Sequence, residues 1–317
     1  MSSPQRLPEW PQLAERTSVA GIRILLFIRR LFGKRCFRAT LLPVLACYWL
    51  TSARLRRVTL AYQARARRAG APLPAHFAGI RELERFALAI LEKFSALSGA
   101  TGRDGPAALE VVGDVAFTAD GPTQGAVILT SHTGCQELLM AHSGAFTDHE
   151  LVILQHTAHA RRFNELLARA GAKPVNASFI EIGAAVSPAL VMELSDRTAR
   201  GAYVILAGDR APMGSEASAR VSFFGDPARF PTGGALLALL LGVPLRMMVC
   251  TRPDEHVRRY RVRFTELCAA PPRVRRAERT AWLREMAALY ARELERELTA
   301  SPLDWANFFD FWEEFRK

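Results

Sequence analysis

The stretch GAVILTSHTGCQELLM, residues 125–140, joins an apolar run to a polar turn and then to a second apolar segment. The continuous run Ala126–Leu129 is typical of a strand buried on both faces of a parallel sheet, and the residues from Cys135 onward predict a helix. His132 therefore follows the C-terminal end of a strand, the edge at which open α/β sheets bind ligands. The stretch predicts an α/β fold with an imidazole at its ligand-binding edge.

Strand and helix signals alternate over the rest of the chain. Apolar runs predict strands at residues 111–117, 125–131, 151–155, 203–207, 245–251 and 259–265. Helices are expected at residues 80–97, 161–169, 188–200, 233–241 and 278–298. Ser187 and Pro188 are typical of a helix start, and Gly201 of a helix end. Such alternation indicates a mainly parallel, mixed sheet covered by helices.

The length of the chain limits the number of domains, and its charge limits the kinds of partner that it would attract. The 317 residues suit one α/β domain, at residues 71–317, preceded by a basic and apolar helical region at residues 1–70. A net charge of +11 would attract phosphate groups, whether of lipids, of an acidic carrier protein or of nucleic acid. No nucleic-acid-binding motif supports the last of these partners. Five scattered cysteines without a CxxC pair argue against a secreted disulfide scaffold and a structural zinc site.

Two apolar stretches near the N-terminus raise the question of a membrane. Residues 19–32 and 37–53 are flanked by arginines, but each falls short of the ~20 apolar residues that a spanning helix needs. Arg23 and Pro43 interrupt them. Mixed basic, aromatic and apolar residues favour helices that lie in the membrane interface. The alternative is a pair of ordinary helices that pack on the domain.

His132 and Glu137 form a candidate catalytic pair. A neutral imidazole can accept a proton from a hydroxyl near pH 7, and a carboxylate at its other ring nitrogen fixes the tautomer. Glu137 lies about one helical turn beyond His132 and is predicted to be that carboxylate. The alternative is that the two side chains never meet, because the spacing alone is a weak signal.

Two further strand ends are expected to converge on the same crevice. The candidates for substrate binding there are His156, His159, Arg162, Asn164, Asp209 and Arg210. The imidazoles and guanidinium groups could donate hydrogen bonds to an oxyanion or a phosphate. Asp209 could instead fix its loop or a neighbouring donor, or form an ion pair with Arg210. The aromatic tail PLDWANFFDFWEEF, residues 302–315, is expected to seal the core, or else to contact lipid.

Two blocks of the sequence resemble one known family. The motif HTGCQE, residues 132–137, and the block from Gly201 to Leu245, with its FFG turn and PTGG helix start, are similar to the bacterial lipid A acyltransferase branch of the lysophospholipid acyltransferase superfamily. The similarity runs from about residue 126 to 249. It implies a glycerolipid acyltransferase-like fold, a His/Glu base, and a place at the cytoplasmic face of the inner membrane.

The resemblance implies a membrane-associated O-acyltransferase. An acyl thioester, on acyl carrier protein or coenzyme A, would acylate a hydroxyl of a lipid or glycolipid, with His132 as the general base and Glu137 holding it. No metal or other cofactor is expected. Two alternatives remain: a thioesterase, in which the same pair activates water, and a non-catalytic membrane-binding protein.

Overall fold

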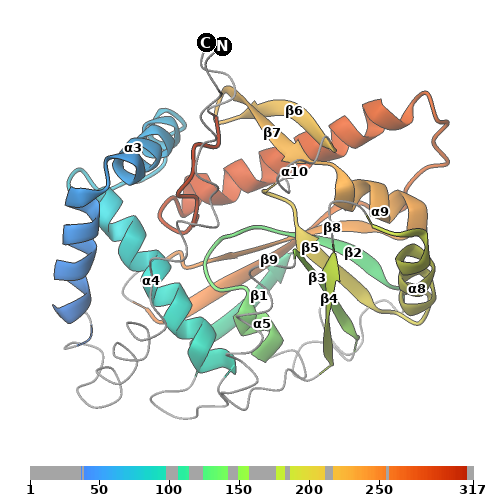
Figure 1. Ribbon diagram of the computed structural model, residues 1–317, viewed down its shortest axis with the longest axis horizontal. Helices are drawn as coiled ribbons and strands as arrows, with labels where there is room; N and C mark the ends of the chain where they lie inside the picture. The colour runs from blue at the N-terminus through green and yellow to red at the C-terminus, as the bar shows by residue number, and fades with distance from the viewer. Residues whose placement is uncertain are drawn as a thin grey trace, which may run out of the picture.

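A mixed sheet of seven strands forms the centre of the molecule in the computed structural model (Figure 1). The structure describes residues 37, 39–97, 106–113, 124–141, 149–156, 176–182, 186–210, 217–254 and 257–312. The strands of the sheet, in spatial order, are β1 (Ala108–Gly113), β9 (Arg259–Cys268), β8 (Leu245–Thr251), β2 (Ala126–Thr130), β5 (Tyr203–Ala207), β3 (Leu151–His156) and β4 (Ala177–Ile182). The predicted α/β class is therefore confirmed.

The sheet is mainly parallel. Five of its six described strand pairs are parallel, and β8 pairs with β9 in the antiparallel direction. Strand β2 has neighbours on both sides, with Thr130 opposite Ala207 of β5 and opposite Met248 of β8. The C-terminal ends of β2 and β5 therefore lie side by side at one edge of the sheet.

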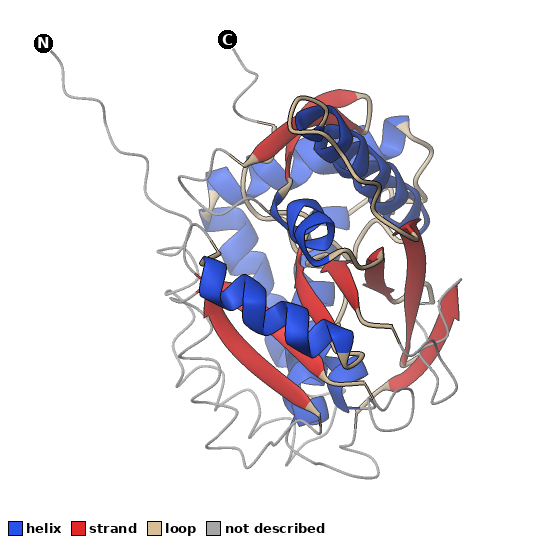
Figure 2. Ribbon diagram, turned by 90° about the vertical axis from the view of Figure 1, so that its right-hand side faces the viewer, coloured by secondary structure: helices blue, strands red, loops and turns tan. Residues whose placement is uncertain are grey.

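Helices cover both faces of the sheet (Figures 1 and 2). Val127 and Leu129 of β2 point into a core shared with helices α8 (Pro188–Ala199), α9 (Gly233–Leu241) and α10 (Arg279–Ala300). Ala126 and Ile128 point to the other face, where Leu138 of helix α5 (Glu137–Ala141) packs. This alternation has the period of two that a strand requires, and both faces are buried, which explains the unbroken apolar run.

Most predicted helices begin and end close to the expected residues. At α8 the Ser187 side chain accepts a hydrogen bond from the N–H of Leu190, as the Ser-Pro signal predicts. Helix α4 (Ala78–Leu97) begins two residues before its predicted start, and α9 has the predicted bounds. The helix expected at residues 161–169 lies outside the described residues.

Four elements were not predicted individually: strand β4, the strands β6 (Ser218–Phe223) and β7 (Asp226–Pro231) of an antiparallel hairpin, and helix α3 (Ala53–Arg68), which lies within the helical region expected at residues 1–70. Helix α3 lies within the region that was predicted to associate with a membrane, and its Tyr62 and Ala66 are buried in the core beside the sheet. The division of the chain at residue 70 stays a prediction.

The first predicted membrane stretch, residues 19–32, lies outside the described residues. Residues 39–51 of the second are helical. Within the described part of the chain, no helix combines the length and the apolar character needed to cross a membrane.

Candidate active site

The pairing of β2 with β5 places His132 beside Asp209. Thr130, the last residue of β2, is opposite Ala207, the last residue of β5. His132 and Asp209 each lie two residues beyond these strand ends. The N–H of Gly208 donates to the carbonyl of Thr130 over 2.8 Å, which continues the pairing one step beyond the strands. Tyr290 of α10 supports the same turn, because its hydroxyl donates to the Thr130 carbonyl over 2.7 Å.

Asp209 binds His132 through both carboxylate oxygens. Its Oδ1 lies 2.7 Å from the ring Nδ1, and its Oδ2 accepts the backbone N–H of His132 over 2.9 Å. The indole N–H of Trp305 donates to the same Oδ2 over 3.1 Å. Asp209 is fully buried, whereas the side chain of His132 is 36% exposed. The buried carboxylate thus holds an imidazole that reaches the surface.

The charge of Asp209 fixes the tautomer of His132. Burial alone would raise the pKa of Asp209, but the His132 ring, its hydrogen bonds and the Arg210 guanidinium outweigh burial and hold the pKa well below its ordinary value. The ionised carboxylate can only accept, so in the neutral imidazole Nδ1 carries the proton and Nε2 keeps its lone pair. Within the described residues Nε2 has no hydrogen-bond partner, and it is therefore available as a base.

Glu137 does not occupy the position that the sequence analysis expected. It forms an ion pair with Lys93 of α4, and its Oε2 accepts the Cys135 thiol over 3.7 Å. Burial would raise the pKa of Glu137, but Lys93 outweighs burial and lowers it. The structure therefore places Asp209, rather than Glu137, at the ring nitrogen of His132. Glu137 begins helix α5 and joins it to α4 instead.

Comparison with known protein families identifies the family of the chain. Residues 124–314 match the family model of bacterial lipid A biosynthesis acyltransferases. The chain belongs to this family. None of the curated proteins compared with the chain matches it. The match confirms the resemblance found in the sequence, and the protein is an acyltransferase. His132, Glu137 and Asp209 all lie within the matched residues.

Asp209 and Arg210, expected to bind substrate, have structural contacts in this acyltransferase. Asp209 is fully buried against His132. The guanidinium of Arg210 donates to the carbonyl of Ala306 and lies 5.3 Å from the centre of the Phe309 ring. Burial lowers the pKa of Arg210, and the charge of Asp209 partly opposes this effect. Asp209 thus connects the end of β5 to His132, and Arg210 connects it to Ala306.

The remaining predicted binding residues of the acyltransferase lie at the end of strand β3 or after it in the sequence. His156 is the last residue of that strand, and its side chain is not among those described. His159, Arg162 and Asn164 lie outside the described residues. Their role in substrate binding stays a prediction. Within the described part of the chain, His, Cys, Asp and Glu side chains form no cluster that could hold a metal ion.

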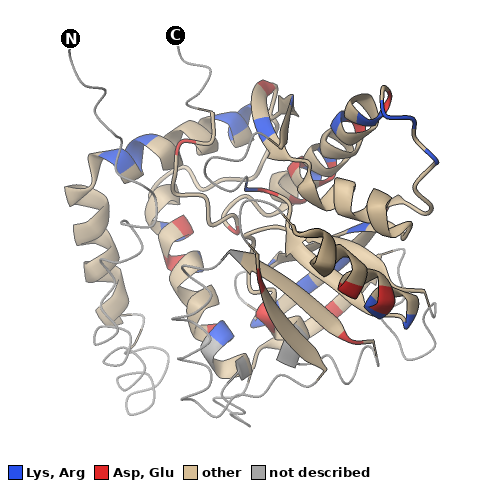
Figure 3. Ribbon diagram, turned by 45° about the vertical axis from the view of Figure 1, so that its right-hand side comes forward, with Lys and Arg blue, Asp and Glu red and all other residues tan. Residues whose placement is uncertain are grey.

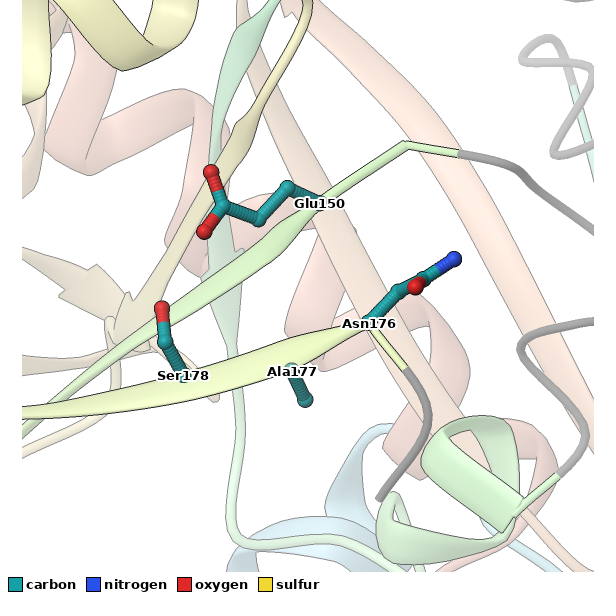
Figure 4. Close-up of a pocket in the computed structure, with 4 residues that line it drawn as sticks. All are labelled: Glu150, Asn176, Ala177 and Ser178. Carbon is teal, nitrogen blue, oxygen red and sulfur yellow. The ribbon is translucent and has the colours of Figure 1, made fainter.

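A surface pocket lies at the edge of the sheet formed by the N-terminal ends of the parallel strands. Glu150, Asn176, Ala177 and Ser178 line it at the N-terminal ends of β3 and β4 (Figure 4). The guanidinium of Arg197 donates to Glu150 and to Ser178. Because β2, β3 and β5 are parallel, this edge is opposite to the one that carries His132. The pocket is thus separate from the candidate active site of the acyltransferase.

Proposed function

We propose that the protein is a membrane-associated O-acyltransferase that transfers a fatty acyl chain from an acyl thioester to a hydroxyl of a lipid or glycolipid. The family match supports acyl transfer. The observation that carries the mechanism is the contact between Asp209 and Nδ1 of His132, which in the neutral ring assigns the free lone pair to Nε2 of a partly exposed side chain. This is the arrangement that a general base for an alcohol requires.

In the proposed reaction Nε2 of His132 accepts the proton of the acceptor hydroxyl while the oxygen attacks the thioester carbonyl. The buried carboxylate of Asp209 stabilises the imidazolium that forms. The tetrahedral intermediate then expels the thiolate, which takes the proton from the imidazolium, so the products are an ester and a thiol. Each hydrogen-bond donor aimed at the oxyanion would contribute about 3 kcal/mol to the transition state.

The acyl donor is proposed to be acyl carrier protein or coenzyme A. Both carry negative charge, on the surface of the protein or on the phosphates of the coenzyme. The net charge of +11 supports either donor, because an excess of arginine raises the local concentration of anions. Purified acyl carrier protein and acyl-coenzyme A, tested separately at increasing ionic strength, would distinguish the two donors by their rates.

The experiment uses full-length protein, an isotope-labelled acyl thioester and a membrane lipid extract, with mass analysis of the lipids formed. We expect wild type to form an acylated lipid and free thiol, and His132→Ala to form neither. His76→Ala is the matched control, because His76 is exposed on the loop before α4. Free fatty acid without acylated lipid would indicate a thioesterase instead. Equal product from His132→Ala and wild type would remove His132 from the mechanism.

We also propose that the N-terminal helical region contacts the membrane surface. The helix of residues 39–51 carries no charged residue, and the charged residues of α3 follow it (Figure 3). The large exposed apolar side chains in the described part of this region are Leu42, Val44, Tyr48, Leu50 and Leu60. An apolar surface next to arginines suits a bilayer that contains anionic lipids.

Sedimentation with vesicles of phosphatidylglycerol and phosphatidylethanolamine tests this contact. Leu50→Asp removes a side chain that is 72% exposed, and we expect it to weaken vesicle binding several-fold. Met192→Asp is the matched control, since Met192 is 71% exposed on helix α8. Equal binding by the two variants would contradict the proposed contact surface.

A further inference from the structure

A segment near the C-terminus, Asp304–Asn307, pairs with the turn that carries His132. Thr133 and Trp305 form an isolated antiparallel bridge. The N–H of Ala306 donates to the carbonyl of His132 over 2.8 Å, and the N–H of Gly134 donates to the carbonyl of Asp304 over 3.0 Å. These hydrogen bonds lie on both sides of Thr133 and fix the backbone from which the imidazole projects.

The same segment reaches the partner of His132. The Trp305 indole N–H donates to Oδ2 of Asp209, and the Arg210 guanidinium donates to the carbonyl of Ala306. One short segment, far from both in sequence, thus touches the end of β2 and the end of β5. The relative positions of the base and its carboxylate depend on these three chain segments together.

Trp305 supplies Asp209 with a hydrogen-bond donor that does not belong to His132. Two of the described N–H groups that bind this carboxylate belong to His132 itself, one from the ring and one from the backbone. The third is the indole N–H of Trp305. Both of these donors move with His132, so neither restrains the carboxylate independently of that residue. A donor from a separate, fixed ring holds Asp209 in place while His132 exchanges protons.

The indole itself is held rigidly. Trp305 is 1% exposed, and its ring centre lies 5.0 Å from that of Tyr62, 5.5 Å from Phe223 and 5.2 Å from Phe311, all at steep angles. The hydroxyl of Tyr62 also donates to the carbonyl of Pro302 over 2.9 Å, which ties the segment to α3. Edge-to-face packing of this kind adds to the stability that burial gives.

We propose that Asp304–Asn307 contributes to the acyl-transfer site and that Trp305 is a positioning residue. Its indole N–H holds Asp209 so that the proton-accepting nitrogen of His132 faces outward. The proposal rests on the proposed function, since it assigns an orienting role within that reaction. Trp305 is too deeply buried to contact substrate. Its loss should therefore lower kcat and leave KM nearly unchanged.

The chain offers a closely matched control for Trp305→Phe. Trp312 belongs to the same aromatic cluster, is 4% exposed, and its ring centre lies 6.2 Å from that of Trp305. Among the described residues its indole nitrogen has no hydrogen-bond partner. Trp312→Phe therefore makes the same change in size within the same core, while the donor to Asp209 remains. Melting temperatures of the two variants would show whether their packing losses are comparable.

Two measurements on the full-length variants test the proposal. The first is steady-state acyl transfer from the labelled thioester. We expect Trp305→Phe to lower kcat about 10- to 100-fold, by analogy with the loss seen when a partner that orients a metal-binding histidine is removed. Trp312→Phe should remain within about two-fold of wild type. Equal kcat values for the two variants would overturn the proposal.

The second measurement is independent of turnover. In protein labelled with ¹⁵N-histidine, the Nδ1–H resonance of His132 is identified by its absence in His132→Ala. We expect this resonance in wild type and in Trp312→Phe, and its loss or broadening in Trp305→Phe. An unchanged resonance in Trp305→Phe, or none in wild type, contradicts the role of Trp305. If wild type forms no acylated lipid, the proposed function fails, and the resonance still decides the role of Trp305.

Discussion

Nδ1 of His132 and Oδ1 of Asp209 lie 2.7 Å apart, although 77 positions separate the two residues in the sequence. Their contact follows from the parallel pairing of β2 with β5, which brings the two strand ends to the same edge of the sheet. The buried carboxylate determines which ring nitrogen carries the proton. The chemistry of the site thus depends on the order of the strands.

Gly134→Ala should disturb the turn that carries His132. Gly134 has φ +50°, and an added Cβ would lie 2.5 Å from the carbonyl oxygen of Cys250 in β8. We expect a loss of about 2 kcal/mol or more in the free energy of unfolding, from backbone strain and the clash together. Urea unfolding followed by tryptophan fluorescence measures this loss, and acyl transfer should fall with it.

Gly242→Ala is the control for backbone strain alone. Gly242 ends helix α9 with φ +66°, and the space around its Cβ position is open. We expect a loss of about 1 kcal/mol, as is typical of a left-handed position without a clash. Losses of equal size at the two glycines would show that the close approach of the turn to β8 has no energetic consequence.

Lys93 and Glu137 should be coupled in stability. Both side chains are mostly buried, with exposed fractions of 25% and 13%. Lys93→Met leaves the carboxylate without its cation and should cost about 1–2 kcal/mol, after allowance for the remaining exposure. In the double variant Lys93→Met/Glu137→Gln no such charge remains, so the total loss should be smaller than the sum of the single losses. Strict additivity in urea unfolding would contradict the pair.

Asp304 should make the stability depend on pH in the acidic range. Burial raises the pKa of this carboxyl group to about 6, although Arg85 and the Arg252 N–H act in the opposite direction. An unfolded aspartate has a pKa of about 3.9, so between about pH 4 and 6 the folded protein binds more protons than the unfolded chain. The free energy of unfolding therefore falls through this group as the pH rises across that window.

Comparison of wild type with Asp304→Asn isolates this effect from the other titrating groups. The difference in unfolding free energy, wild type minus variant, should decrease by about 2 kcal/mol between pH 4.5 and pH 7. Chemical unfolding at both pH values measures it. A difference that stays constant, or that increases with pH, would contradict the raised pKa.

The sequence predicted the parts of the fold whose signal is local. The bounds of β5, β8 and α9 were correct because a largely apolar run defines each of them, and Gly242 marks the end of α9. Strand β7 was missed because its sequence, DPARFP, contains two prolines and a mixture of polar and apolar residues. Such a pattern is typical of turns as much as of edge strands.

The site was predictable only in part. His132 was found because it directly follows an apolar strand. Glu137 was preferred as its partner because it is near in sequence, whereas the contact with Asp209 depends on β2 and β5 being neighbours in the sheet. Trp305 was noted in an aromatic tail that was expected to seal the core. Nothing in that local pattern indicated that its indole N–H reaches Asp209.

The rate of acyl transfer by Asp209→Asn and by Glu137→Gln, each measured against wild type, shows which carboxylate orients His132. If Asp209 orients His132 and stabilises its imidazolium, Asp209→Asn should lower kcat by about 10³- to 10⁴-fold with an intact fold. Glu137→Gln should retain activity within about ten-fold, because it loses only the pairing with Lys93. Near-normal transfer by Asp209→Asn, with severe loss in Glu137→Gln, would contradict the orienting role of Asp209 and assign it to Glu137.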